Sequence, residues 1–333
     1  MNKKTKRMTK VVGYSLMIFM LGSFLYAQDK ATDKATVPFS NPSEPGLVKA
    51  SVHNGSITVI GTSGKEVMVE ARVREKLVQD EEIKRNEKAK GLRLVQVDTT
   101  GLRVMEDDNV MRISVSSYKQ TVDLTIRVPS SSSVSISAHE NGDVVIENVN
   151  GEIEATNHRG NIRLTGISSA VVAHTYDGEI KAVFKSVSPE LPMSFTSWQG
   201  DIDVTLPSST KANLKMKSGR GEVYTDFDLQ IVRNPDEEFD FDSRKLKNLQ
   251  KDDLRNRFYV VTPPTPPKAV DVKADVSKEL KESIALRARD AMYINADALD
   301  ISFNKYIYAK INGGGPVYVF NNNNGDILLR KAK

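Results

Sequence analysis

The strongest pattern along the chain is a short phrase: a polar residue, a glycine, a second polar residue, then isoleucine or valine. A turn and strand that return at a regular interval are typical of a coil that stacks on itself. The pattern therefore predicts a β-solenoid in which the glycines are structural turn residues. These glycines are Gly55, Gly142, Gly151, Gly160, Gly178, Gly200, Gly221 and Gly325.

Five of these glycines are nearly evenly spaced in the centre of the chain. Gly142, Gly160, Gly178, Gly200 and Gly221 lie 18, 18, 22 and 21 residues apart. If one coil takes about 20 residues, these five glycines stack in one column and Gly151 falls half a turn away. Glycine suits such a corner because it has no Cβ to clash with a neighbouring backbone.

The residues after each central glycine alternate as a strand with one buried face requires. The second position after the glycine is aliphatic in every copy: Val144, Ile162, Ile180, Ile202 and Val223. The third position is largely polar, and the fourth is mostly apolar again. We therefore expect the aliphatic side chains to face inward and the polar ones to face solvent.

The solenoid domain is expected to span residues 47–228, because period-two alternation begins at Leu47. The preceding segment, 28–46, is polar and contains three prolines, so it is predicted to be a disordered spacer.

Beyond residue 228 the pattern breaks. Residues 229–275 carry charge runs and a proline cluster at 263–267, which is typical of a solvated insertion. Apolar residues at helical spacing predict a short helix within 276–299. Residues 300–333 return to strand patterns, so they are expected to complete the solenoid.

The first 27 residues predict export. Basic residues precede an apolar run of 17 residues, 11–27, which fits a signal peptide cleaved after Ala27. The expected location is then the periplasm or the cell surface. The alternative is an uncleaved anchor, since 17 residues are at the short limit for a spanning helix. In that case the N-terminal segment is the expected membrane contact.

The charge balance argues against one class of partner, and the lack of cysteine excludes two covalent modifications. The net charge is only +4, from 47 basic and 43 acidic residues, and most of the excess lies in the first ten residues. This balance argues against nucleic acid as a partner, because nucleic-acid-binding domains gather basic residues on one face. The chain has no cysteine, so it forms neither disulfides nor a lipid-modified N-terminal cysteine.

Three ring-bearing residues recur two positions before a central glycine. The column reads Glu140, His158, Tyr176, Trp198 and Gly219. If the register holds, His158, Tyr176 and Trp198 lie side by side on an exposed edge. They either form a binding strip, for example for sugar rings, or simply cover the corner as a stacking ladder.

The position after each glycine is rich in oxygen: Asp143, Asn161, Glu179, Asp201 and Glu222. Such a column could hold calcium, but solvated turn residues explain it better because the double glycine of calcium-binding coils is missing. No metal site and no cofactor are expected.

Catalysis has little support in the sequence, because no nucleophile elbow, phosphate loop or metal-ligand spacing is found. No catalytic residue is assigned. A polysaccharide-cleaving enzyme would need two of the carboxylates of Asp177, Glu179, Asp201 and Asp203 to face each other across a groove.

Two longer phrases and one C-terminal motif carry a family resemblance. The phrases end in Leu124-x-Ile126-x-Val128-Pro129 and Ile202-x-Val204-x-Leu206-Pro207, and the motif is Ile311-Asn312-Gly313-Gly314-Gly315-Pro316. With the glycine corners, residues 47–228 and 300–330 resemble the bacterial putative-adhesin domain family, a domain of unknown function in exported proteins. The resemblance implies an all-β, right-handed parallel β-helix or β-solenoid of about five or more rungs. It brings no catalytic residues.

These observations favour a non-catalytic envelope protein, an adhesin or scaffold that presents a flat binding surface. Its expected partner is an envelope polysaccharide or another envelope protein. Two alternatives stay open: a polysaccharide-active β-helix enzyme, and a periplasmic sensor or assembly partner that docks another protein through the helix at 277–292.

Overall fold

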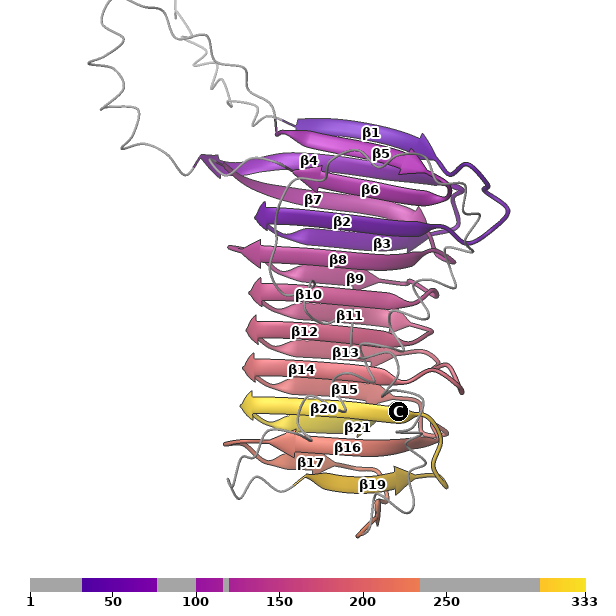
Figure 1. The fold of residues 1–333 in the computed structure, drawn as a ribbon, viewed down its shortest axis with the longest axis vertical. Coiled ribbons are helices and arrows are strands. Elements are labelled where there is room, and N and C mark those ends of the chain that lie inside the picture. The colour runs from indigo at the N-terminus through magenta and orange to yellow at the C-terminus, as the bar shows by residue number, and fades with distance from the viewer. Residues whose placement is uncertain (1–31, 77–99, 116–119, 234–305) are drawn as a thin grey trace, which may run out of the picture.

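A computed structural model of the protein describes residues 32–76, 100–115, 120–233 and 306–333. These residues form strands and turns and no helix. Two large, mostly parallel, unclosed sheets stack into a tall column (Figure 1). The all-β, solenoid-like fold expected from the sequence is confirmed. The N-terminal export segment, the insertion beyond Arg233 and the helix expected within 276–299 lie outside the described residues.

The sheet that we name sheet A is ordered, from one end of the column to the other, as β1 (Thr32–Pro38), β4 (Glu66–Lys76), β7 (Gln120–Pro129), β3 (Ile57–Thr62), β9 (Val144–Glu147), β11 (Ile162–Ile167), β13 (Ile180–Phe184), β15 (Ile202–Leu206), β21 (Ile327–Lys331) and β17 (Val223–Thr225).

The opposite sheet, sheet B, is ordered from the other end as β18 (Gln230–Ile231), β19 (Ile307–Ile311), β16 (Ala212–Ser218), β20 (Val317–Asn324), β14 (Met193–Gln199), β12 (Val171–Asp177), β10 (Ile153–Arg159), β8 (Ser133–Glu140), β2 (Leu47–Asn54), β6 (Val110–Val115) and β5 (Leu102–Asp107). We call a strand of sheet B, the glycine corner after it and the next strand of sheet A one rung.

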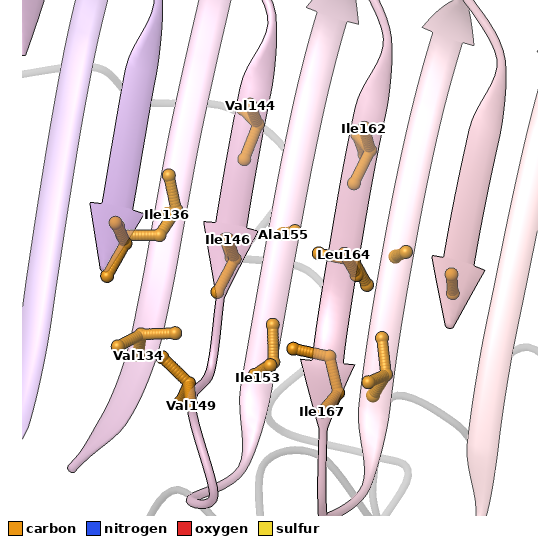
Figure 2. Close-up of a cluster of buried hydrophobic side chains, with 14 of the residues drawn as sticks. Val134, Ile136, Val144, Ile146, Val149, Ile153, Ala155, Ile162, Leu164 and Ile167 are labelled. Atoms are coloured by element: carbon orange, nitrogen blue, oxygen red, sulfur yellow. The ribbon is translucent and has the colours of Figure 1, made fainter. Parts of the chain in front are cut away.

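The core lies between the two sheets and is built from the predicted aliphatic columns. Val144, Ile162, Ile180 and Ile202 are fully buried, and so are the second-column residues Ile146, Leu164, Ala182 and Val204. Figure 2 shows these columns meeting the inward side chains of β8 and β10, such as Ile136 and Ile153. Each such side chain contributes about 1.5–3 kcal/mol to folding.

The corner glycines stack on one another with almost no space between rungs. A Cβ on Gly178 would lie 2.1 Å from the carbonyl oxygen of Gly160, and one on Gly160 would lie 2.1 Å from that of Gly142. Real Cβ atoms do not approach an oxygen this closely, so any larger residue would push the rungs apart. The repeated glycine is therefore a requirement of the stacking distance, which is about 4.8 Å between strands.

A column of polar side chains next to the corners links each rung to the adjacent one by hydrogen bonds. In five rungs, the residue three places before the corner glycine donates a side-chain hydrogen bond to the glycine carbonyl of the adjacent rung. The donors are Asn157, Thr175, Ser197, Asn322 and Ser218, and the acceptors are the carbonyls of Gly142, Gly160, Gly178, Gly200 and Gly325. Each bond satisfies the carbonyl of a half-buried corner glycine.

The order of the column differs from the prediction at its C-terminal end. Gly221 does not stack on Gly200; Gly325 lies between them, and its Cβ position is 2.6 Å from the Gly200 carbonyl oxygen. The strands agree, because β20 pairs with both β14 and β16 and β21 with both β15 and β17. The rung formed by β20 and β21, drawn in yellow in Figure 1, thus lies between two rungs that precede it in the chain, and we call it the inserted rung. Spacing alone could not reveal it, since Gly325 is 104 residues beyond Gly221.

The column also extends past Gly142 at its other end. A Cβ on Gly142 would lie 2.2 Å from the carbonyl carbon of Gly55, so Gly55 belongs to the same column. Gly151 lies outside it, as expected, and faces Ser132 at the opposite corner.

The prediction of a disordered spacer over 28–46 is wrong for its described part. Residues 32–38 form β1, which pairs antiparallel with β4 along its whole length. Phe39 after it is only 4% exposed and lies against Gly46. The alternation of half-buried and exposed residues in β1 is that of an edge strand, and Pro38 is tolerated because it ends an edge strand. Antiparallel strands thus cover this end of the column, and the antiparallel strand β19 lies near the other end.

Candidate functional site

The outward face of sheet B carries a continuous row of rings that crosses five rungs. The row consists of His53, His139, His158, Tyr176 and Trp198, from strands β2, β8, β10, β12 and β14. They lie next to one another because these strands pair in parallel and in register. We call this set the ring row.

Two neighbouring pairs of rings in the row stack, and a third pair is tilted. The centroids of His158 and Tyr176 are 5.3 Å apart at an interplanar angle of 21°. Tyr176 and Trp198 are 5.9 Å apart and almost parallel, at 3°. At the far end, His53 and His139 are 5.7 Å apart and tilted by 36°. These separations fall in the range of about 4.5–7 Å that favours aromatic pairs.

The row is accessible to a ligand. Tyr176 is 43% exposed and Trp198 is 48% exposed, and both are among the few large apolar side chains at the surface of the described residues. In-register neighbours on rigid strands hold their rings in place, so a ligand that stacks on them would order few additional side chains. The sequence correctly predicted that His158, Tyr176 and Trp198 lie side by side.

Two members of the row were missed, and one residue was misplaced. The sequence put Glu140 beside His158, but the pairing of Ala138 with Asn157 puts His139 there instead. The reason is one extra residue at this corner, Asn141, which adopts a left-handed conformation with φ 60°. An asparagine before glycine is a known signal for such a turn residue, but the extra residue shows only in the register.

Beyond Trp198 the row loses its rings. Pairing of Ser197 with Asn322 and of Gln199 with Asn324 puts Asn323 next to Trp198. Gly219 follows in the next rung. An amide therefore lies beside the last ring, and a glycine lies beyond the amide.

The fourth histidine lies on the same face, one row away. His174 pairs with Thr156 on one side and Thr196 on the other. All four histidines of the chain thus gather on the outward face of sheet B.

Two of these histidines, His139 and His174, have lowered pKa values and so resist protonation. Desolvation lowers the pKa of His139, the positive charges of His53 and His158 lower it further, and Glu140 opposes them weakly. Desolvation also lowers the pKa of His174, and His158 adds to the effect. Both imidazoles are therefore neutral at neutral pH, which keeps this face available for stacking and for hydrogen bonds from ring nitrogens.

The oxygen-rich column has a structural role. Asp143 Oδ1 accepts the backbone N–H of Asn161, and Asn161 Oδ1 accepts that of Glu179. At the other end Asp201 Oδ1 accepts the N–H of Asp326, whose own Oδ1 accepts the N–H of Glu222. These side chains link successive corners, as solvated turn residues do. No group of three histidines or carboxylates within the described ranges is arranged to hold a metal ion.

Two of the four carboxylates considered for catalysis, Asp201 and Asp203, bind neighbouring rungs. Asp203 accepts a hydrogen bond of 2.8 Å from Arg330 and lies 3.8 Å from Lys181. Asp201 is occupied by the backbone of the inserted rung.

Comparison with known proteins gives one match to a family model over part of the chain and two solved structures of low similarity. Residues 139–249 match the family model described as Toastrack DUF4097. A solved "putative cell adhesion protein" from Clostridium sporogenes ATCC 15579 has 11% identity and a TM-score of 0.39, covering 91% of this chain and 100% of its own. A solved "putative adhesin" from Bacteroides fragilis NCTC 9343 has 10% identity and a TM-score of 0.32, covering 91% and 98%.

Comparison with curated proteins gives no match. Within the part of the chain that the structure describes, no helix has the length and apolar character needed to cross a membrane.

Proposed function

We propose that this chain, which contains a Toastrack DUF4097 domain over residues 139–249, is an exported, non-catalytic protein of the bacterial cell envelope. It acts as an adhesin or scaffold in the periplasm or at the cell surface, and it binds an envelope polysaccharide through the ring row. The single observation that carries this proposal is the stacked, exposed row itself.

The chemistry of the row suits a sugar chain. A sugar ring presents C–H groups on its faces and hydroxyls around its rim, so it fits a surface that combines apolar ring atoms with polar groups. Tyr176, Trp198 and the histidines each offer an apolar ring with a polar tip. Asn323 adds an amide that can donate and accept hydrogen bonds beside the indole.

The arrangement of the row favours a long ligand over a small one. The rings run along the axis of the solenoid, one per rung, so successive units of an extended polymer could each contact a ring. We take the solenoid to be right-handed, because connections between parallel strands of one sheet nearly always are. The leader over residues 1–27 supports export, with cleavage after Ala27.

The two alternatives receive no such support. An enzyme would need free carboxylates across a groove, whereas Asp201 and Asp203 bind neighbouring rungs. The docking helix of the sensor hypothesis lies outside the described residues.

The test compares two exposed aromatic residues on opposite faces. Trp198→Ala removes the last ring of the row, whereas Tyr224→Ala removes a ring of similar exposure, 54% against 48%, from β17 in sheet A. Binding of the purified protein to a glycan array and to isolated envelope polysaccharide is measured for both. We expect Trp198→Ala to weaken binding about tenfold, since a ring contact of about 1.4 kcal/mol is lost.

Tyr224→Ala should bind as the wild type does. Equal polysaccharide binding by the wild type and Trp198→Ala, or turnover of the polysaccharide by the wild type, would overturn the proposal.

A further inference from the structure

A second row of side chains runs beside the ring row on the outward face of sheet B. The register of nine neighbouring strands brings its members side by side, two residues before the ring row in each strand that the rows share. None of the nine is buried, and we call this set the polar row. It consists of Arg103, Ser114, Ser51, Ser137, Thr156, His174, Thr196, Asn321 and Lys217. A polymer that stacks on the ring row therefore also meets a line of hydrogen-bonding groups.

The charge of this face is one-sided. The polar row and the ring row contain no carboxylate, and the polar row ends in a permanent cation on each side, Arg103 and Lys217. The imbalance is largest near Trp198. There the strands β14, β20, β16 and β19 hold three lysines and no aspartate or glutamate.

The carboxylates of the neighbouring sheet B strands lie outside the two rows. Glu140 Oε1 is 3.5 Å from Arg159, and Glu154 accepts a hydrogen bond from Ser135. Asp177 lies at the corner after Tyr176. The stretch of sheet B from Trp198 onward is therefore the most positive part of this face.

Two of the lysines there crowd each other. The Nζ atoms of Lys215 and Lys217 both lie over the ring of Tyr306, 4.7 and 5.2 Å from its centroid. Desolvation lowers the pKa of Lys215, and the positive charge of Lys217 lowers it further. Two ammonium groups this close raise the local positive potential, which attracts an anion.

On the outward face of sheet A, by contrast, three cations are paired with carboxylates. Arg163 binds Asp143, Lys181 lies 3.8 Å from Asp203, and Arg330 donates to Asp203 at 2.8 Å. These pairs link neighbouring rungs and balance the charge of that face. The two faces of the solenoid therefore differ in the charge of the ligand that they attract.

We propose that the ligand of the ring row is an anionic polysaccharide, an inference that rests on the function proposed above. Its sugar rings stack on Tyr176 and Trp198, and its carboxylate or phosphate groups accept hydrogen bonds from Lys217 and from the Asn321 amide. Lys217 lies two strands beyond Trp198, about 10 Å across the sheet, so one extended chain contacts both. A neutral polymer would cover the ammonium group without compensating its charge.

The test uses one polymer backbone with and without charge. The purified protein is titrated with polygalacturonate and with its methyl ester, in which the carboxylates are blocked. A glycan whose units are joined by phosphodiesters shows whether phosphate is the preferred anion. We expect at least one anionic polymer to bind about fivefold more tightly than the ester at low ionic strength, and added salt to shrink the difference.

Three variants locate the charge effect. Lys217→Gln should weaken binding of the anionic polymer about threefold and leave binding of the ester unchanged. Lys217→Arg keeps the charge and should bind as the wild type does. The matched control is Lys181→Gln, which removes an exposed cation from β13 of sheet A and should change neither affinity.

Equal affinity of the wild type for the charged and the esterified polymers would overturn the anionic ligand. Tighter binding to anionic phospholipid vesicles or to DNA than to any of the glycans would overturn it too. If Trp198→Ala weakens binding of both polymers while Lys217→Gln weakens neither, the ring row binds polysaccharide and only the present inference fails. If Trp198→Ala binds every polymer as the wild type does, the proposed function fails, and this inference fails with it.

Discussion

The middle of the solenoid and its C-terminal end are built by the same local rules but assembled in different orders. From β8 to β15, residues 133–206, the rungs follow one another in space as they do in the chain. At the C-terminal end, the rung of β20 and β21 enters between two rungs that precede it in the sequence.

The corners of the two regions are nearly identical. In the middle, Asn157 Nδ2 donates to the Gly142 carbonyl at 2.9 Å and to the Asn161 carbonyl at 3.3 Å. In the inserted rung, Asn322 Nδ2 donates to the Gly200 carbonyl at 2.9 Å and to the Asp326 carbonyl at 3.2 Å. A rung therefore carries the means to stack, but no information about which rung it stacks on.

The largest expected effect compares two glycines, one in each region. Gly178→Ala in the middle would place a Cβ 2.1 Å from the Gly160 carbonyl oxygen. It should lower the free energy of unfolding by about 3 kcal/mol or more, because backbone has to move. Gly313→Ala, in the turn between β19 and β20, meets nothing within 4 Å and has only its φ of +87° to strain. Its loss should be about 1–2 kcal/mol.

Urea denaturation of both variants measures the difference. Equal losses would mean that the corner column tolerates a side chain, against the close stacking described above.

A smaller effect distinguishes the two matched asparagines. Asn322→Ala should cost about 1–3 kcal/mol, because it leaves the half-buried Gly200 carbonyl without its side-chain donor. Asn157→Ala should cost about 1 kcal/mol less, since Asn157 Oδ1 is buried without a hydrogen bond, whereas Asn322 Oδ1 accepts the N–H of Asn324. Free energies of unfolding for the two variants decide this. A larger loss for Asn157→Ala would show that the middle corners matter more than the inserted one.

The smallest expected effect is a pH dependence that comes from the histidines on the outward face of sheet B. The folded pKa of His139 lies below its ordinary value of about 6.5. The unfolded chain therefore binds more protons, and stability falls as the pH drops below about 6.5. The unfolding temperature should be lower at about pH 5.5 than at about pH 7.5.

His139→Gln should reduce this difference, while His174, which shifts in the same direction, keeps part of it. Hydrogen exchange should show the acid-dependent opening first in β8 and β10 and not in β16 and β20, which carry no histidine. A pH dependence unchanged in His139→Gln would remove the ring row from this effect.

Short stretches of the sequence determine much of the local structure. Alternation after each glycine predicted the inward columns, because a strand places successive side chains on opposite faces. The repeated spacing predicted that His158, Tyr176 and Trp198 lie together, because equal rungs bring equal positions side by side. Pro129 and Pro207 likewise predicted one turn used twice, and both carbonyls accept the N–H three residues later.

What the tertiary structure alone decided is the order of the rungs and the register at irregular corners. The place of Gly325 between Gly200 and Gly221 depends on contacts between segments about a hundred residues apart, for which similar rungs offer nearly equal alternatives. His139 joined the ring row only because Asn141 added a residue to its corner. The pairing of β1 with β4 depended on an edge that does not exist until the sheet has formed. Local preferences act over a few residues, whereas these choices are made between whole rungs, so they could not be obtained from the spacing of glycines.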